Sequence, residues 1–312
     1  MTTLRNMLLL FAALSCAGTA SASPLGGLFS GKAVDAVRIL QSAKDAFVEV
    51  DPKQERVIGR EAAAVLLGAV PLTRDQALQR YVNRVGHWVA LQSERPDLEW
   101  RFAVLDSMDV NAFASPGGYV FITKGLLLRM GSEAELAGVL AHEVAHVVQK
   151  HHLQAVQKGA KLDLAIGVAS TQVKGGDRAK LDMIAGGFKD LYARGLDKDD
   201  EYEADRMGLV LATRAGYDPY GLLATLQTLG AMNPKDGALA FLFKTHPAPG
   251  QRLDLIDAVF TPLEAYARQP AVKDRFLREV TAAQKRGAFE NPGFTLNAAV
   301  SPAAARHLHP HD

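Results

Sequence analysis

Residues 132–148 read SEAELAGVLAHEVAHVV, and this stretch decides how the whole chain is interpreted. Ser132 stands three residues before Glu135, the spacing of a helix-capping pair, and apolar residues recur after it at helical intervals. His142 and His146 are four residues apart, so on a helix both imidazoles project from one face. We therefore expect a buried helix that presents two histidines to one metal ion.

Glu143 completes an HExxH pattern with these histidines. Its carboxylate can reach an attacking water instead of the metal itself. An incidental pair of core histidines is the alternative, but the apolar surroundings disfavour it, because unpaired polar groups are expensive to bury. The pattern therefore predicts a zinc peptidase with one Zn²⁺ per chain, His142 and His146 as ligands and Glu143 as the catalytic carboxylate.

A catalytic zinc site needs a third protein ligand and one open position. His152 lies six residues after His146, a spacing used by peptidases of the HExxHxxGxxH type. Those enzymes need a glycine to turn the chain, and Gln149 stands at that position here. Residues 147–158 are therefore expected to continue as helix and to carry His152 away from the metal.

Glu201 is the second candidate for the third ligand, in the segment EYEAD at 201–205. On a helix, Glu201 and Asp205 share one face and Glu203 points roughly opposite. Glu201 can then bind the metal while Asp205 accepts a hydrogen bond from a ligand histidine. A solvated acidic helix start is the alternative for this segment alone, but the upstream motif favours the metal interpretation.

The first 22 residues predict a cleaved secretory signal peptide, with Arg5 before the apolar run 7–14 and small residues at 20–22. Cleavage would remove the single cysteine, Cys16, and would lower Lys+Arg from 35 to 34, equal to the 34 Asp+Glu. The mature chain would be neutral, which gives no electrostatic case for nucleic-acid binding. We expect a periplasmic protein without a transmembrane span in its mature chain. Lipoprotein anchoring at Cys16 is the alternative.

After the signal we expect a flexible lead-in at 23–33, a metallopeptidase domain at 34–260, and a C-terminal helix with a disordered tail at 261–312. The domain should be α+β and mainly helical. Strands are predicted at 100–105 and 119–123, and helices from Thr73 (capped by Thr73 with Gln76) and at about 178–192, 197–215, 219–231 and 249–259.

Four segments resemble one family of zinc peptidases, which includes HtpX, Oma-type and CAAX-prenyl proteases, and especially its periplasmic BepA/LoiP-like members. The segments are NAFASPGGYVFITKGLL (111–127), ELAGVLAHEVAHVVQKHH (135–152), DEYEADRMGLVLATRAGYDP (200–219) and THPAPGQRL (245–253). The resemblance implies a zincin-like (gluzincin) domain with a small sheet beside the active-site helix. It also implies that Glu201 joins His142 and His146 as a zinc ligand.

The same resemblance draws attention to His246 and Arg252 in the HPxxxxR segment. It places both near the open side of the zinc, where either can stabilise the oxyanion. In BepA-like proteins the equivalent histidine can instead occupy the fourth zinc position and hold the enzyme off. Both roles of His246 stay open from the sequence.

The segment Asn111, Ala112, Phe113 and Ala114 resembles the family's edge strand, which can bind an extended substrate by β-augmentation. Such binding selects exposed backbone, so the expected substrates are unfolded or misassembled envelope and outer-membrane proteins, cleaved in quality control. A zinc-containing periplasmic chaperone or assembly factor with latched or slow peptidase activity is the alternative. Only about 50 residues follow Thr261, too few for the helical-repeat domain of BepA-like proteins, so their specific partners are not carried over. The sequence predicts no oligomeric state.

Overall fold

The computed structural model describes residues 50–165 and 187–290, apart from residues 189 and 193. The chain divides into two compact units, Met1–Asp45 and Ala46–Asp312, and the first unit lies outside the described residues. The expected signal peptide, the lead-in and the tail beyond residue 290 therefore lie outside them too, as does most of the helix expected at 178–192.

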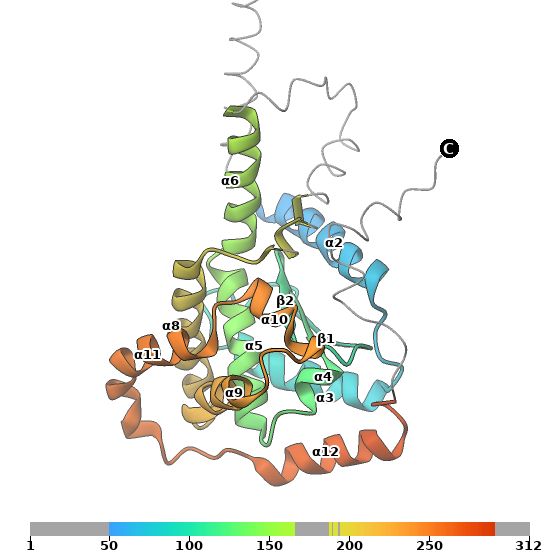
Figure 1. Cartoon of the computed structure of the whole chain (residues 1–312), viewed down its shortest axis with the longest axis vertical. Coiled ribbons are helices and arrows are strands. Elements are labelled where there is room, and N and C mark those ends of the chain that lie inside the picture. Colours follow the sequence, from blue (N-terminus) through green and yellow to red (C-terminus); the bar gives the residue numbers. More distant parts are fainter. Residues whose placement is uncertain (1–49, 166–186, 189, 193, 291–312) are drawn as a thin grey trace, which may run out of the picture. The chain divides into compact units, whose positions relative to one another are not determined.

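The described part is an α+β domain in which helices predominate, as the sequence predicted (Figure 1). The strands are β1 (Arg101–Leu105), β2 (Ala112–Ser115) and β3 (Tyr119–Thr123). The helices are α2 (Pro52–Ala69), α3 (Gln76–Ala90), α4 (Lys124–Leu127), α5 (Glu133–Val148), α6 (His151–Ala165), α8 (Lys198–Arg214), α9 (Tyr220–Ala231), α10 (Leu242–Thr245), α11 (Pro249–Phe260) and α12 (Lys273–Lys285), with short 3₁₀ turns at Gly237–Leu239 and Thr261–Tyr266. None of these described helices combines the length and the apolar character that a membrane span requires.

The sheet has the strand order β1–β3–β2, with β1 parallel and β2 antiparallel to β3. Successive side chains of a strand point to opposite faces. Val120 and Ile122 accordingly enter a hydrophobic cluster with α3 and α5, whereas Phe121 and Phe113 enter a second cluster with α2. The sheet therefore lies between two hydrophobic layers, and β2 forms one of its edges.

The predicted cap of α5 is confirmed, because the Ser132 hydroxyl accepts a hydrogen bond from the backbone N–H of Glu135 at 3.2 Å. The predicted cap of α3 is wrong. Asp75 caps that helix, and its carboxylate accepts the backbone N–H groups of the second and third helical residues. Thr73 does not serve as the cap, because its backbone N–H donates to Val104 of β1 and ties this segment to the sheet.

The prediction that residues 147–158 form one continuous helix is also wrong. The chain turns between α5 and α6 at Lys150, whose φ of 60° lies in the left-handed region. Arg95 holds this turn by donating to a carbonyl in the last turn of α5 at 3.1 Å, and the buried Glu55 pairs with both Arg95 and Lys150. The turn brings His151 and His152 back toward α5.

The helix expected after residue 261 is α12, and it packs on the same core as α3 and α5. Its Phe276 is fully buried in their hydrophobic cluster. Arg275 forms a bidentate ion pair with Glu133 in the first turn of α5, and the hydroxyls of Tyr81 and Tyr217 donate to the same carboxylate at 2.9 and 2.8 Å. These contacts fix the beginning of α5.

Gly208 lets α8 pack closely against α5 beside His142. A Cβ atom added at Gly208 of α8 would lie 2.9 Å from the backbone nitrogen of His142. Real Cβ atoms do not come this close to backbone, so any larger residue would push the two helices apart.

Gly208→Ala should lower the free energy of unfolding by about 1–3 kcal/mol, the usual cost of overpacking a tight interface. Urea denaturation measures this change. The control is Gly250→Ala on α11, where an added Cβ meets nothing within 4 Å. The control should be neutral or more stable by up to about 1 kcal/mol, because alanine is the better helix former. A Gly208→Ala variant as stable as the wild type would contradict the close-contact argument.

Candidate active site

Three buried side chains from two helices converge on one point. His142 and His146 lie on one face of α5, with their Nε2 atoms 3.1 Å apart. Glu201, in the first turn of α8, brings Oε2 to 3.7 Å from Nε2 of His142 and Oε1 to 3.5 Å from Nε2 of His146. Within the described residues, they are the one group of this kind whose ligand atoms all lie within 4.8 Å of one another. The structure thus brings the three predicted ligands together.

This set of residues fits a metal ion. Ligand atoms about 2.0–2.1 Å from a tetrahedral zinc ion lie about 3.4 Å from one another, and the three separations fall on either side of that value. Oε1 of Glu201 is buried and accepts no hydrogen bond, although a buried carboxylate oxygen without a partner is unfavourable. Two imidazole nitrogens and a carboxylate are donors that zinc prefers, and a cation would compensate the buried negative charge.

Asp205 supports His142 from behind, as predicted for a residue that orients a ligand histidine. Its Oδ1 lies 3.0 Å from Nδ1 of His142. Arg252, on α11, donates to both oxygens of Asp205 at 2.8 and 2.5 Å. Burial raises the pKa of Asp205, but the charge and hydrogen bonds of Arg252 outweigh burial and hold that pKa well below its usual range. Asp205 therefore stays ionised as the acceptor for His142.

The position of Arg252 differs from the expectation that it faces the open side of the metal. Its Nε and Nη2 are both directed at Asp205, and Nη2 lies 3.3 Å from Nδ1 of His142, the nitrogen that faces away from the metal set. The main contact of Arg252 is therefore with the residue that orients His142. Arg252 also lines a pocket with Glu143 and His246, and its expected role at the oxyanion stays a prediction.

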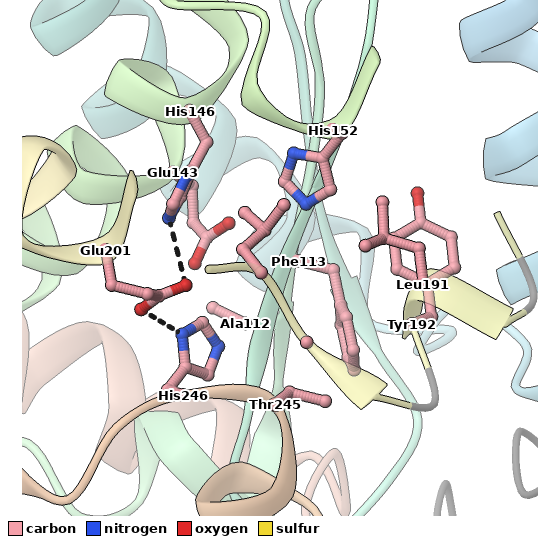
Figure 2. Close-up of a pocket in the computed structure, with 12 residues that line it drawn as sticks. Ala112, Phe113, Glu143, His146, His152, Leu191, Tyr192, Glu201, Thr245 and His246 are labelled. Atoms are coloured by element: carbon pink, nitrogen blue, oxygen red, sulfur yellow. Dashed lines mark hydrogen bonds and ion pairs between the residues drawn. The ribbon is translucent and has the colours of Figure 1, made fainter. Parts of the chain in front are cut away.

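His246 contacts the third ligand directly. It follows α10, and its Nδ1 lies 2.7 Å from Oε2 of Glu201, as Figure 2 shows. Burial lowers the pKa of His246, but the adjacent Glu201 carboxylate raises it by more, so that the net pKa is raised. This place beside the ligand set suits either expected role, a latch on the metal or a donor to the oxyanion.

Glu143 points into the same pocket as His146 and Glu201 (Figure 2). Its side chain is buried, and burial raises the pKa of its carboxyl group despite the opposing influence of His142 and His246. Among the described residues, no hydrogen bond or ion pair holds its carboxylate. A buried carboxylate that is uncommitted and next to a metal set is placed to take up a proton.

Two pockets flank Glu143 and His246, and both are also lined by Ala112. The first lies against Tyr192 and His152, and the second against aliphatic side chains of α4, α5, α9 and α10. The expectation that His152 is carried away is wrong, since its ring centroid lies 5.4 Å from that of His146. His152 still does not belong to the ligand set, and burial lowers its pKa to about 3, so that it is neutral.

The edge of β2 leaves only part of its backbone without a hydrogen bond. The N–H of Thr123 donates to the carbonyl of Asn111, so Ala112 and Ala114 turn their backbone groups away from β3. The N–H of Ala112 donates to the Asn111 side chain at 2.9 Å, and the carbonyl of Ala114 accepts from the Tyr192 hydroxyl at 3.1 Å. The carbonyl of Ala112 and the N–H of Ala114 have no hydrogen bond within the described part of the chain.

The two larger side chains of the predicted substrate-binding segment serve the fold as well. Asn111 is fully buried, and its amide donates to the hydroxyl of Thr245 at 3.3 Å. Phe113 packs against the rings of Tyr192 and Phe241 and lines the first pocket. The whole segment is buried, with Ala112 4% and Ala114 0% exposed, so its two backbone groups without a hydrogen bond are covered in this structure.

The fold and the ligand set together define a zincin-like metallopeptidase domain. Comparison with known proteins agrees, because residues 76–259 match the model of Peptidase family M48. The match covers more than half of the chain, and the chain belongs to this family. The family predicted from the four sequence segments is thereby confirmed.

Three relatives show how far the similarity extends. The beta-barrel assembly-enhancing protease of Escherichia coli K12 is 29% identical over 210 residues, 64% of this chain and 42% of that protein. The mitochondrial metalloendopeptidase OMA1 of Schizosaccharomyces pombe is 31% identical over 178 residues, 57% and 51% of the two chains. The OMA1 of Arabidopsis thaliana is 27% identical over 236 residues, which cover 75% of this chain and 44% of that protein. The chain spans about half the length, or less, of these relatives.

Sequence reasoning missed two residues that contact the site. His151 places its Nδ1 2.9 Å from Nδ1 of His146, and Tyr192 occupies part of the β2 edge. The histidine doublet at 151–152 was the one available signal for the first. Tyr192 falls in a segment expected only to be helical, and no motif marks it.

Arg252→Met should lower the free energy of unfolding by about 3–5 kcal/mol, because it leaves the buried carboxylate of Asp205 without its partner. The measurement is urea denaturation with a chelator present, so that metal loss makes no contribution. In an Asp205→Asn background the same change should be much less costly, since no buried charge remains.

The control for this prediction is Arg206→Met, an exposed arginine beside Asp205 in sequence, which should change stability by less than about 0.5 kcal/mol. Equal losses for Arg252→Met with and without Asp205 would contradict the pairing.

Proposed function

We propose that the chain is a zinc-dependent endopeptidase that cleaves unfolded or misassembled envelope proteins, outer-membrane proteins included, in quality control. The observation that carries this proposal is a buried three-residue ligand set beside an uncommitted carboxylate, Glu143, which lines one pocket with His146 and Glu201 and a second with His142. The names of the relatives support it, a beta-barrel assembly-enhancing protease and metalloendopeptidases. The signal expected at 1–22 supports a periplasmic location.

The chemistry divides among a few residues. His142, His146 and Glu201 would hold one zinc ion, which when bound supplies a Lewis acid to polarise the scissile carbonyl and favour attack by water. Glu143 takes the proton from the attacking water and passes it to the leaving amine. Asp205 keeps the His142 ring in its ligand orientation. Arg252 holds Asp205 in place through two hydrogen bonds.

The substrate preference follows from the β2 edge. The carbonyl of Ala112 and the N–H of Ala114 can pair with a peptide only if that peptide is extended, its backbone is accessible, and the side chains that bury this edge make room for it. The largely aliphatic second pocket favours an apolar side chain next to the scissile bond. Apolar side chains on accessible, extended backbone are typical of unfolded chains and rare on folded ones.

A second candidate function is a zinc-containing chaperone or assembly factor whose peptidase activity is latched or slow. The contact of 2.7 Å between His246 and Glu201 favours it, because this imidazole lines both pockets beside the ligand set. A histidine held there competes with the substrate carbonyl for the open side of the metal. Such a protein would bind unfolded chains with the same edge strand.

Zinc content and proteolysis of unfolded casein test the proposal on the wild type, Glu143→Gln and His246→Ala. Glu143→Gln should keep one zinc per chain and lose about 10²–10⁴-fold in rate, the usual contribution of a general base. If His246→Ala is active over a quiet wild type, His246 is a latch. If His246→Ala loses activity, His246 takes part in catalysis.

The matched control is Asp199→Asn, an exposed carboxylate on α8 two residues before Glu201, which should keep both zinc and activity. A purified wild type without zinc, or a fully active Glu143→Gln, would contradict the proposal. Envelope function that survives Glu143→Gln intact would favour the chaperone.

Ala114→Pro tests the edge strand. Proline removes the N–H of Ala114, which points away from β3, so no ladder hydrogen bond is lost. Because Ala114 is fully buried, urea denaturation must first show that the variant folds. We expect kcat/KM for unfolded casein to fall about tenfold, the value of one hydrogen bond of about 1.4 kcal/mol. Zinc content and the circular dichroism spectrum should stay unchanged. An unaltered kcat/KM in a folded, zinc-loaded variant would show that substrates do not pair with this edge.

A further inference from the structure

The proposed mechanism leaves one buried contact at the ligand set unused. Nδ1 of His146 lies 2.9 Å from Nδ1 of His151, and their ring centroids are 5.1 Å apart. Both side chains are buried, with 1% and 3% of their surface exposed. The rear nitrogen of His142 meets the carboxylate of Asp205, whereas that of His146 meets a second imidazole.

The ligand role of His146 fixes the direction of this hydrogen bond. A neutral imidazole that offers the lone pair of Nε2 to a metal carries its proton on Nδ1. Nδ1–H of His146 is then the donor, and Nδ1 of His151 must be the acceptor. His151 consequently carries its own proton on Nε2.

The far side of His151 favours the same arrangement. Its Nε2 faces the carboxylates of Glu203 at 3.6 Å and Asp200 at 3.9 Å, both on α8. Gln149 holds Glu203 in place by donating to it at 2.6 Å. Two negative groups attract an N–H and repel a lone pair, so they select the tautomer of His151 that can accept from His146.

The backbone is bent to allow this contact. Lys150 is one of two described residues other than glycine with a positive φ, at 60°. A non-glycine residue in this region costs about 1–2 kcal/mol, and such strain concentrates at functional sites. Without the turn, His151 would follow the helix away from His146.

We propose that His151 is a positioning residue for the metal ligand His146. It accepts the hydrogen bond from Nδ1–H and thereby holds the ring in the tautomer and rotation that direct Nε2 at the metal. His151 itself touches neither metal nor substrate. The inference rests on the zinc site proposed above and adds a residue whose effect is on metal affinity.

The test is the zinc dissociation constant of the full chain, measured by competition with a chromogenic chelator, together with the rate of zinc release. His151→Leu removes the acceptor at similar volume and should weaken zinc binding by about 10–100-fold, as is usual for residues that support metal ligands. His151→Asn should restore affinity to within about threefold of wild type, since its amide oxygen can replace Nδ1 as the acceptor.

The matched control is His152→Leu, the same substitution one residue later on α6. His152 is buried as well, but its Nδ1 has no hydrogen-bond partner within the described residues. The zinc affinity of the His152→Leu variant should stay within about threefold of wild type.

Two outcomes would count against the inference. Wild-type affinity in a folded His151→Leu variant overturns it, and so does a His151→Asn variant that binds zinc as weakly as His151→Leu. If His151→Leu fails to fold, His151→Ala, which also removes the acceptor, takes its place in the comparison with His151→Asn. A wild-type chain that binds no zinc overturns the proposed metal site itself, which is a different result from zinc binding that is indifferent to His151.

Discussion

The close contact between α5 and α8 is the constraint on which the rest of the structure depends. Because Gly208 has no side chain, the backbone of α8 lies against that of His142, and its first turn carries Glu201 between two imidazoles. Three polar groups in a dry interior are unfavourable together unless a cation joins them. The contact that brings these groups together therefore makes the stability of the domain depend on whether the site holds a cation.

Side chains on two faces of α8 contact either the metal ligands or the residues that support them. Glu201 faces the metal position itself, and Asp205, one turn later on the same face, reaches the rear nitrogen of His142. Glu203 points away from both and reaches His151 beyond the end of α5. Helix α8 therefore orients both ligand histidines. It acts on His142 directly through Asp205, and on His146 indirectly through Glu203 and His151.

The sequence predicted the parts of this site that follow from helical periodicity. Spacings of four residues place two side chains on one helix face, and this pattern predicted the pairs His142–His146 and Glu201–Asp205. The metal-binding chemistry of histidine and carboxylate side chains then indicated their roles. The sequence did not predict the turn at Lys150. A glycine there would have indicated a left-handed backbone conformation, whereas a lysine gives no such signal. The cause of the turn is tertiary, the pairing of the buried Glu55 with a partly exposed Arg95 from a distant part of the chain. The side of the site taken by Arg252 likewise depends on how α11 docks.

The edge of β2 shows how the fold limits access to its own chemistry. Of the four outward backbone groups of Ala112 and Ala114, two already have partners in Asn111 and Tyr192. A peptide that pairs there without displacing Tyr192 gains only two hydrogen bonds, which together are worth about 1–3 kcal/mol. So little backbone energy cannot unfold a stable domain. Under the function proposed above, the covered edge therefore favours chains that are already extended, before His246 or the pockets are considered.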